Sequence, residues 1–271
     1  MEATFTTPVV RCFSEGKRSV VSDAVAVEEP LEIRVVNDGE PRTLSVTMRT
    51  PGADADLAVG FLFTEGAIAR AADVVSVESR EHSVDVHLRK GLHPDWGRFE
   101  RHVYLSSSCG VCGKASIEAV SQTCTLRPHE FSIVPSVLRS LPERLRGAQA
   151  AFQSTGGIHA AGWFSPEGEL LAHAEDVGRH NALDKLIGHL LQQGEVPLPP
   201  GILALSGRAS FELIQKARLA GASVVAAVGA PSSLAVELSA EGDLTLAGFV
   251  RHDRFNLYTG AHRVQPEIPV S

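Results

Sequence analysis

In the first third of the chain, short runs of alternating apolar and polar residues predict β-strands with one face in a core. The turn-forming sequence Asn-Asp-Gly at 37–39 separates the first two runs. Asp54 or Asp56 is placed to cap a helix after them, and Gly66 lies toward its end. This pattern predicts a small sheet crossed by one helix, with strands at residues 31–37, 43–49, 74–78 and 84–88.

From residue 155 onward, strand-like apolar runs alternate with helical patterns. In one helix, Leu183, Leu186 and Leu190 recur at the spacing of a buried helical face. Buried strands separated by helices predict a mostly parallel sheet covered on both faces. Strands are predicted at 158–164, 170–173, 202–205, 224–228 and 244–250, with helices at 177–193, 211–220 and 234–238. Two further helices are predicted before this region, at 114–122 and 135–146. We therefore expect a small α+β domain at 1–105 and a larger α/β domain at 106–271.

Composition excludes several classes of protein. The 271 residues include 44% hydrophobic and 21% charged residues, as is typical of soluble globular proteins. The formal net charge of −7 argues against broad nucleic-acid binding, which needs a basic face. The sequence shows neither a signal peptide nor an apolar run of the ~18–20 residues that a membrane span needs. We therefore expect a cytoplasmic location and no membrane partner.

Cys109 and Cys112 form a CGVC pair in the sequence SSSCGVCGK. On the first turn of a helix, a three-residue spacing places both sulfurs on one side. The adjacent Lys114 and the free N–H groups of a helix start favour a thiolate. A thiolate at Cys109 can attack a sulfur donor and hold the sulfur as a persulfide, and Cys112 can receive it or help to expel it.

Three other interpretations of the pair remain open. A structural zinc site usually needs four ligands, and only Cys124 with scattered histidines such as His102 and His129 could complete it. A thiol–disulfide oxidoreductase lacks its usual setting, in which CxxC opens the first helix of a βαβ unit. A buried pair of small side chains fits poorly with a loop rich in Gly and Ser.

The sequence His173-Ala174-Glu175 marks a strand-to-helix transition in the predicted layout. Zinc-dependent nucleoside deaminases place an H-x-E motif there and follow it with P-C-x-x-C before the next helix. This chain has Ser-Gly-Arg-Ala-Ser at 206–210 instead, and no cysteine after Cys124. The layout therefore resembles the cytidine-deaminase fold, but two of the three expected zinc ligands are missing.

Several segments are candidates for binding an anion or a flat ring. Small-residue loops at 155–157, 206–208 and 229–233 precede or follow strands of the predicted sheet, where ligands gather. Ordinary helix caps explain most such loops taken singly, but three along one sheet favour a binding edge. A polar cluster of Asp176, Arg179, His180 and Asn181 follows the H-x-E sequence and is either a binding site or a buried hydrogen-bond network. Near the C-terminus, Arg251 and Arg254 can meet phosphate, and Phe255 or Tyr258 can stack on a heterocycle or close the core.

Taken together, these segments resemble the FdhD family of formate dehydrogenase accessory sulfurtransferases. The resemblance runs in order along nearly the whole chain. The matching segments are EEPLEIRV, RTPGADADLAVGFLFTEGAI, SSSCGVCGK, TGGIHAAG, EDVGRHNALDK, SGRASFELIQKA, GAPSSLAVELS and GFVRHDRFNLYTG.

The resemblance implies a function that the residues alone do not show. Family members take sulfur from a cysteine desulfurase and pass it to the molybdenum cofactor, Mo-bis(molybdopterin guanine dinucleotide), for formate dehydrogenase. Cys109 matches the persulfide carrier and Cys112 its partner. The family's cofactor-binding segment matches Phe255, Asn256, Leu257, Tyr258, Thr259 and Gly260, with GDP as an expected mimic.

The resemblance also implies a fold and an oligomeric state. The family fold pairs a small α+β domain with a cytidine-deaminase-like, three-layer domain, and members are usually homodimers. We expect no zinc. Two alternatives stay open: a non-catalytic chaperone that binds and delivers the cofactor, and a zinc-stabilised interaction module.

Overall fold

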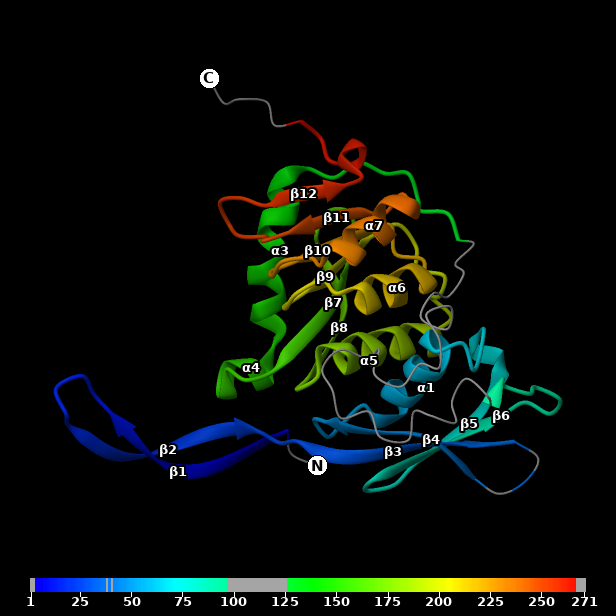
Figure 1. Cartoon of the computed structure of the whole chain (residues 1–271), viewed down its shortest axis with the longest axis horizontal. Helices are drawn as coiled ribbons and strands as arrows, with labels where there is room; N and C mark the ends of the chain where they lie inside the picture. Colours follow the sequence, from blue (N-terminus) through cyan, green and yellow to red (C-terminus); the bar gives the residue numbers. More distant parts are fainter. Residues whose placement is uncertain (1–2, 38, 40, 97–125, 267–271) are drawn as a thin grey trace.

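The computed structural model describes residues 3–37, 39, 41–96 and 126–266, arranged as two sheets and a separate ribbon (Figure 1). The smaller sheet has four strands in the order β4-β3-β6-β5, and α1 (Asp54–Thr64) lies across it. Its strands are β3 (Glu29–Val36), β4 (Arg42–Arg49), β5 (Val74–Ser79) and β6 (Ser83–Leu88), with the short helix η1 at Ala71–Asp73. The two predicted hairpins and the helix between them are confirmed. The core side of this sheet is apolar because residues of one parity along each strand, such as Leu31 and Ile33, face α1.

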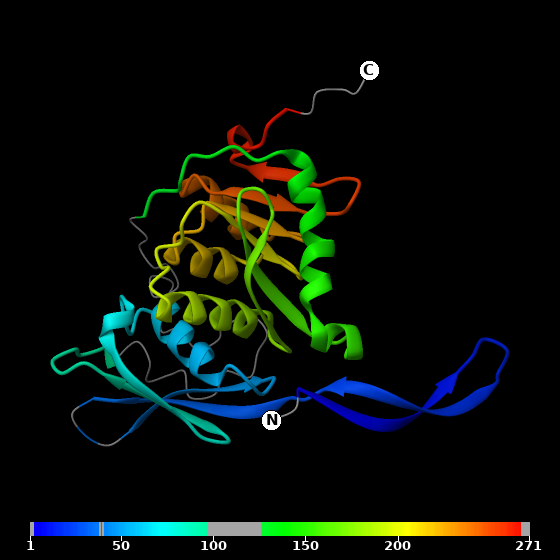
Figure 2. The same ribbon diagram turned by 180° about the vertical axis from the view of Figure 1, so that it is seen from behind.

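The larger sheet has six strands in the order β12-β11-β10-β9-β7-β8. Its strands are β7 (His159–Phe164), β8 (Leu170–Asp176), β9 (Ile202–Leu205), β10 (Val224–Ala227), β11 (Thr245–Gly248) and β12 (Asn256–Thr259). Helices cover both faces, as predicted: α5 (Arg179–Gln192), α6 (Phe211–Leu219) and α7 (Ser233–Glu241) on one, and α3 (Pro135–Ala148) on the other (Figures 1 and 2). Along β7, Ala161 and Trp163 enter the core under α5 and α6, whereas Ala160 and Phe164 enter the core under α3.

The prediction of a mostly parallel sheet is wrong. Only β9, β10 and β11 pair in parallel, whereas β7 is antiparallel to both β8 and β9, and β12 is antiparallel to β11. The short connection at 165–169 leaves room only for a hairpin, so β8 must run opposite to β7. An apolar run indicates that a strand is buried on both faces, but it does not indicate whether the strand runs parallel or antiparallel to its neighbours.

A two-stranded ribbon, β1 (Thr4–Cys12) with β2 (Arg18–Ala26), extends from the body beside α4 (Ala150–Thr155) (Figures 1 and 2). Neither the ribbon nor α4 was predicted. Apolar side chains occur on both faces of the ribbon, and Phe5, Val10 and Val20 are exposed, so the sequence lacks the alternation of a strand with one buried face. None of the helices in the described part of the chain combines the length and apolarity that crossing a bilayer requires.

Several predictions fall on residues 97–125, outside the described part of the chain. They include the CGVC pair, the helix at 114–122 and the domain boundary after residue 105. That boundary therefore stays a prediction. The cytidine-deaminase-like description of the larger sheet also stays a prediction.

Helix α1 of the smaller sheet packs directly on α5 of the larger one, at two glycines. A Cβ on Gly60 would overlap the backbone carbonyl of Asp184, and a Cβ on Gly188 would overlap that of Asp56. The two backbones touch because neither glycine carries a side chain. This contact fixes the two sheets relative to each other and shapes the space between them.

We predict that Gly60→Ala lowers the free energy of unfolding by about 1–3 kcal/mol, because the neighbouring atoms are backbone and cannot rotate away. The matched control is Gly147→Ala, since a Cβ at this position in α3 would meet no atom within 4 Å. That variant should match the wild type or gain up to about 1 kcal/mol from helix propensity. Urea unfolding of both variants checks this, and equal stabilities would contradict the close crossing.

Candidate functional site

The loops that follow β9 and β10 meet at one edge of the larger sheet. The backbone N–H of Gly229 donates to the carbonyl of Gly207 at 2.8 Å, and that of Ala209 donates to the carbonyl of Ala230 at 3.1 Å. These are two of the three loops that the sequence predicted for an anion, and the structure places them side by side. These two N–H groups hydrogen-bond one loop to the other, so they hold the sheet edge together and are not donors for a ligand.

A cavity of about 320 Å³ lies where α5 begins, between α1, β3, β4 and α6. Its volume is at the lower end of the range for small-molecule sites. The predicted cluster members Arg179, His180 and Asn181 line it together with His159, so the structure brings most of that cluster to one place. The remaining lining residues include Glu28, Thr47, Met48, Phe61, Val177, Gly178, Glu212 and Lys216.

Asp176 belongs to this cluster but is fully buried beneath it. Its carboxylate pairs with Lys185 Nζ at 2.8 Å and accepts hydrogen bonds from the backbone N–H groups of Thr50 and Gly178, at 3.1 and 2.8 Å. Asn181 Nδ2 also donates to it, at 3.0 Å. A buried charge with this many partners is structural, so this part of the cluster is the hydrogen-bond network that the sequence left open.

His180 lies on the cavity wall with its Nε2 3.4 Å from Ser210 Oγ and 3.3 Å from Glu212 Oε2. Burial, followed by the positive charges of Lys216 and Arg179, lowers the pKa of His180 to about 3. The ring is therefore neutral at pH 7. A serine nucleophile would need the serine and the acid on opposite ring nitrogens, and here both contact the same one, so this trio does not activate Ser210.

Lys216 closes the floor of the same cavity and is almost completely buried. Its Nζ lies 2.7 Å from Asp184 Oδ2, 2.9 Å from Thr64 Oγ1 and 3.6 Å from Glu65 Oε1. The adjacent carboxylates outweigh the effect of burial and raise the pKa of Lys216, so it stays protonated. The ion pair joins α1, α5 and α6 beneath the site.

A second cavity, of about 360 Å³, lies on the other side of His159, between the sheet edge and α3 and α4. Gly156, Gly157 and Ser206 line it, so the third predicted loop also reaches this edge. His159 lines both cavities, and a Cβ on Gly207 would lie 3.3 Å from its Nδ1. Burial, with the charge of Arg179, lowers the pKa of His159. A neutral imidazole therefore separates the two cavities.

The deaminase-type H-x-E sequence does not form a catalytic pair. The sequence precedes the transition from β8 to α5, as predicted, but both His173 and Glu175 still lie within β8, which runs to Asp176. His173 is exposed, and the Glu175 carboxylate accepts from the backbone N–H groups of Ala151 and Phe152, at 3.1 and 3.0 Å. The strand runs three residues further than predicted because β8 pairs with β7 along its full length.

The predicted cofactor segment 255–260 forms the edge strand β12 and lines neither cavity. Phe255 and Leu257 pack against the core under α3. Thr259 Oγ1 donates to the carbonyl of Leu244 at 2.6 Å, and a Cβ on Gly260 would overlap Thr245. Two members of the segment remain available to a ligand because their side chains are exposed: Asn256 and Tyr258.

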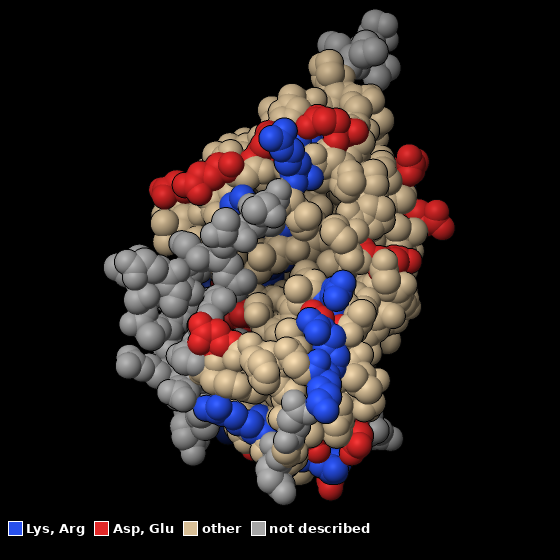
Figure 3. All heavy atoms as spheres, turned by 90° about the vertical axis from the view of Figure 1, so that its right-hand side faces the viewer, with Lys and Arg blue, Asp and Glu red and all other residues tan. Residues whose placement is uncertain are grey.

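Arginine at 251 holds the loop before β12, since its Nη1 donates to the carbonyls of Val228 and Val250 at 2.7 and 2.8 Å. Arg254 is exposed and pairs only with the neighbouring Asp253 among the described residues. On the face drawn in Figure 3, Lys and Arg side chains form small groups, and Asp and Glu form others.

Comparison with known proteins decides the family. The model of the FdhD/NarQ family matches residues 26–265. This chain belongs to the FdhD/NarQ family.

Relatives within the FdhD/NarQ family match along most of their own length. A protein of Streptomyces avermitilis named sulfur carrier protein FdhD is 48% identical over 263 residues, covering 92% of each chain. A protein of the same name from Mycobacterium tuberculosis is 47% identical over 270 residues, covering 94% of this chain and 96% of the relative. A solved structure from Desulfotalea psychrophila, described as a formate dehydrogenase accessory protein, superimposes with a TM-score of 0.78 at 21% identity and covers 97% of this chain and 100% of its own. The fold is therefore shared.

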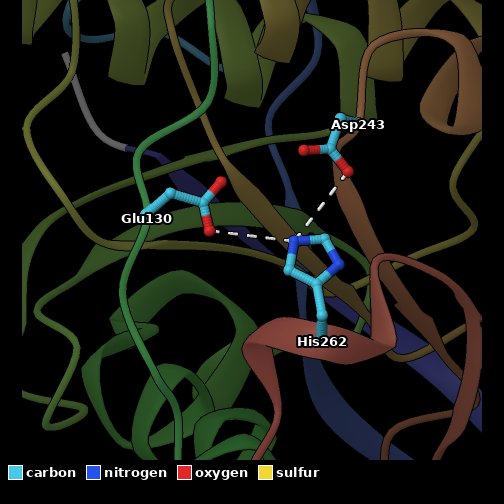
Figure 4. A group of neighbouring side chains, drawn as sticks. All are labelled: Glu130, Asp243 and His262. Atoms are coloured by element: carbon cyan, nitrogen blue, oxygen red, sulfur yellow. Dashed lines mark ion pairs between the residues drawn. The ribbon is translucent and has the colours of Figure 1, made fainter.

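One cluster in this FdhD/NarQ family member has the composition of a metal site and was not predicted. Figure 4 shows the exposed side chains of Glu130, Asp243 and His262 pointing toward one another, with His262 Nε2 3.9 Å from each carboxylate. The buried Arg263 donates to both carboxylates at 2.9 Å. Because a guanidinium already neutralises the carboxylates, the arrangement is an ion-pair network that anchors the short 3₁₀ helix η3 (Ala261–Arg263). His129, a possible zinc ligand by sequence, has its Nε2 3.1 Å from the carbonyl of Leu198 instead.

We predict that neutral His180 makes the protein less stable in mild acid. The folded pKa of about 3 is below the ordinary value of 6.5, so the unfolded chain binds more protons between those values. Stability is therefore full above pH 6.5 and falls as the pH drops, by up to about 1.4 kcal/mol per pH unit. Urea unfolding from pH 7 to pH 5 should show a shallower loss for His180→Gln.

The control for this measurement is His252→Gln, because that side chain is 88% exposed. It should follow the wild-type pH dependence. An unchanged slope in His180→Gln would show that His180 is not the group that is held neutral by the fold.

Proposed function

We propose that this protein is a sulfur carrier for the maturation of formate dehydrogenase and that it transfers sulfur through Cys109. The observation that carries the proposal is the match, over more than nine-tenths of the chain, to relatives named sulfur carrier protein FdhD. The CGVC sequence supports the chemistry, because a thiolate is the nucleophile that accepts sulfur.

The proposed acceptor step is an exchange between two sulfur groups. The Cys109 thiolate attacks the terminal sulfur of a persulfide on a cysteine desulfurase, a new S–S bond forms, and the donor cysteine leaves as a thiolate. Cys109 then carries one additional sulfur atom. In the second step, the Cys112 thiolate attacks the Cys109 sulfur of this persulfide, the bond to the outer sulfur breaks, and a Cys109–Cys112 disulfide forms. The outer sulfur leaves at the sulfide level and passes to the molybdenum cofactor.

The proposed substrate is Mo-bis(molybdopterin guanine dinucleotide), and the proposed docking surface is the edge of the larger sheet. Two cavities open there and share His159. The parallel strands β9 and β10 end at this edge, and ligands of α/β proteins bind at the carboxyl ends of parallel strands. The exposed side chains of Asn256 and Tyr258 lie on β12 of the same sheet. GDP, which carries the nucleotide end of this substrate, is the probe of choice.

We further propose the biological setting that the family implies. The donor is a cysteine desulfurase, the recipient is formate dehydrogenase, and the carrier works as a homodimer in the cytoplasm. The larger sheet with its covering helices is a cytidine-deaminase-like unit without zinc. In this view the enzyme is a sulfurtransferase, and a chaperone that only delivers the cofactor is the alternative.

We predict that Cys109→Ala abolishes the acceptance of ³⁵S from a cysteine desulfurase, because Cys109 is the proposed attacking thiolate. The matched control is Cys12→Ala, since Cys12 is an exposed free thiol on β1. This control should retain label and activate formate dehydrogenase as the wild type does. The measurement is protein-bound label after non-reducing electrophoresis, with formate dehydrogenase activity in parallel.

A different outcome would select the alternative. If Cys109→Ala lost label but still activated formate dehydrogenase, a delivery chaperone would replace the sulfur relay. Stoichiometric zinc bound through Cys109 and Cys112 in the purified protein would also overturn the persulfide mechanism.

A further inference from the structure

The lining of the cavity between the sheet edge and α3 and α4 suits a flat ring. Its walls combine the apolar side chains of Pro142, Leu145 and Phe152 with the small residues Gly156 and Gly157. The guanidinium of Arg146 lies 5.5 Å from the centre of the Phe152 ring, and both side chains line the cavity. An arginine and an aromatic ring at the same wall offer two surfaces on which a heterocycle stacks.

Gln149 sets this cavity apart from a simple apolar pocket. Its side chain lines the cavity, and the residue is only 3% exposed. Among the described residues, its amide nitrogen Nε2 has no hydrogen-bond partner. A buried donor without an acceptor is unfavourable. Asn37 Oδ1 and Trp163 Nε1 are also without a partner among the described residues, but only Gln149 of these three lines this cavity. A ligand that presents an acceptor here would satisfy it.

The backbone fixes Gln149 where α3 ends and α4 begins. Its N–H donates to the carbonyl of Arg146 at 3.2 Å, and its carbonyl accepts from the N–H of Gln153 at 3.0 Å. These bonds fix the backbone of Gln149, and burial of its side chain in the cavity lining limits where the amide can lie. A donor confined to a desolvated cavity discriminates between ligands, because the wrong group opposite it leaves the donor unpaired.

We propose that this cavity binds a flat heterocycle that carries a ring carbonyl, and that the Gln149 amide nitrogen donates a hydrogen bond to that carbonyl oxygen. Guanine has such a carbonyl, and so does a pterin, whereas adenine presents an amino group at the equivalent position. The inference rests on the proposed function, because guanine and pterin are both parts of the proposed substrate. It adds the place where the ring binds, the residue that recognises it (Gln149), and a preference for a ring carbonyl over an amino group.

The experiment measures binding to the full chain by titration calorimetry with GDP, ADP and neopterin. We expect GDP to bind at least tenfold more tightly than ADP, since one unpaired donor is worth about a factor of ten. Tighter binding of neopterin than of GDP would assign the cavity to the pterin end. Failure of both ligands to bind would overturn the inference.

Gln149→Leu separates a ligand-binding role from a structural one. It removes the unpartnered donor, so the ligand-free variant should unfold at the same urea concentration as the wild type or a higher one. Binding of the preferred ligand should nevertheless fall about tenfold. A loss of stability in parallel with the loss of binding would mean that Gln149 is structural, and would overturn the inference.

Gln149→Glu replaces the donor by a carboxylate and should weaken binding more strongly than the leucine variant. Its matched control is Gln153→Glu, which adds the same charge at an exposed position outside the cavity lining. Equal binding by these two variants would contradict the assignment of Gln149. Sulfur loading of Cys109 involves no nucleotide, so a failure here leaves the labelling test of the proposed function independent.

Discussion

The contact between α1 and α5 is the constraint on which the rest of the structure depends. Gly60 and Gly188 let the two backbones touch, and the buried ion pair of Lys216 and Asp184 joins both helices to α6. Truncating one partner of such a pair costs about 3–5 kcal/mol, because the other charge is then left buried alone. The cavity at the start of α5 exists because these contacts hold the smaller sheet against the larger one at a fixed distance.

The edge of the larger sheet is where the candidate functional features meet. Loops after β9 and β10 are bonded to each other, and the start of β7 places His159 between two cavities. Both histidines of this region, His159 and His180, have lowered pKa values because burial disfavours their charged forms. The edge therefore presents neutral imidazoles beside the fixed positive charge of Arg179, which suits a ligand with both flat and anionic parts.

Two kinds of buried polar group occur in this protein, and they have different meanings. Asp176 and Lys216 are surrounded by partners and contribute to holding elements together. Gln149 has a donor without a partner in the described part of the chain. The first kind is explained by folding alone. The second is a cost to folding that a bound ligand can offset, which is why it is the better indicator of a site.

The sequence by itself determined the family and most of the local elements, although not the ribbon of β1 and β2 or helix α4. The hairpins of the smaller sheet, the Leu stripe of α5 and the apolar strands β9 and β10 follow from periodicity, because burial on one face or on both imposes it. The family segments along the chain were confirmed by the match over residues 26–265. Tertiary structure alone decided strand direction, the use of His173 and Glu175 within β8, and the outward or inward facing of each residue in β12. It also brought Gln149, His159 and Ser206 to one cavity. These residues come from three separate segments, and only the packing of α3 and α4 on the sheet edge, which no local pattern encodes, makes them neighbours.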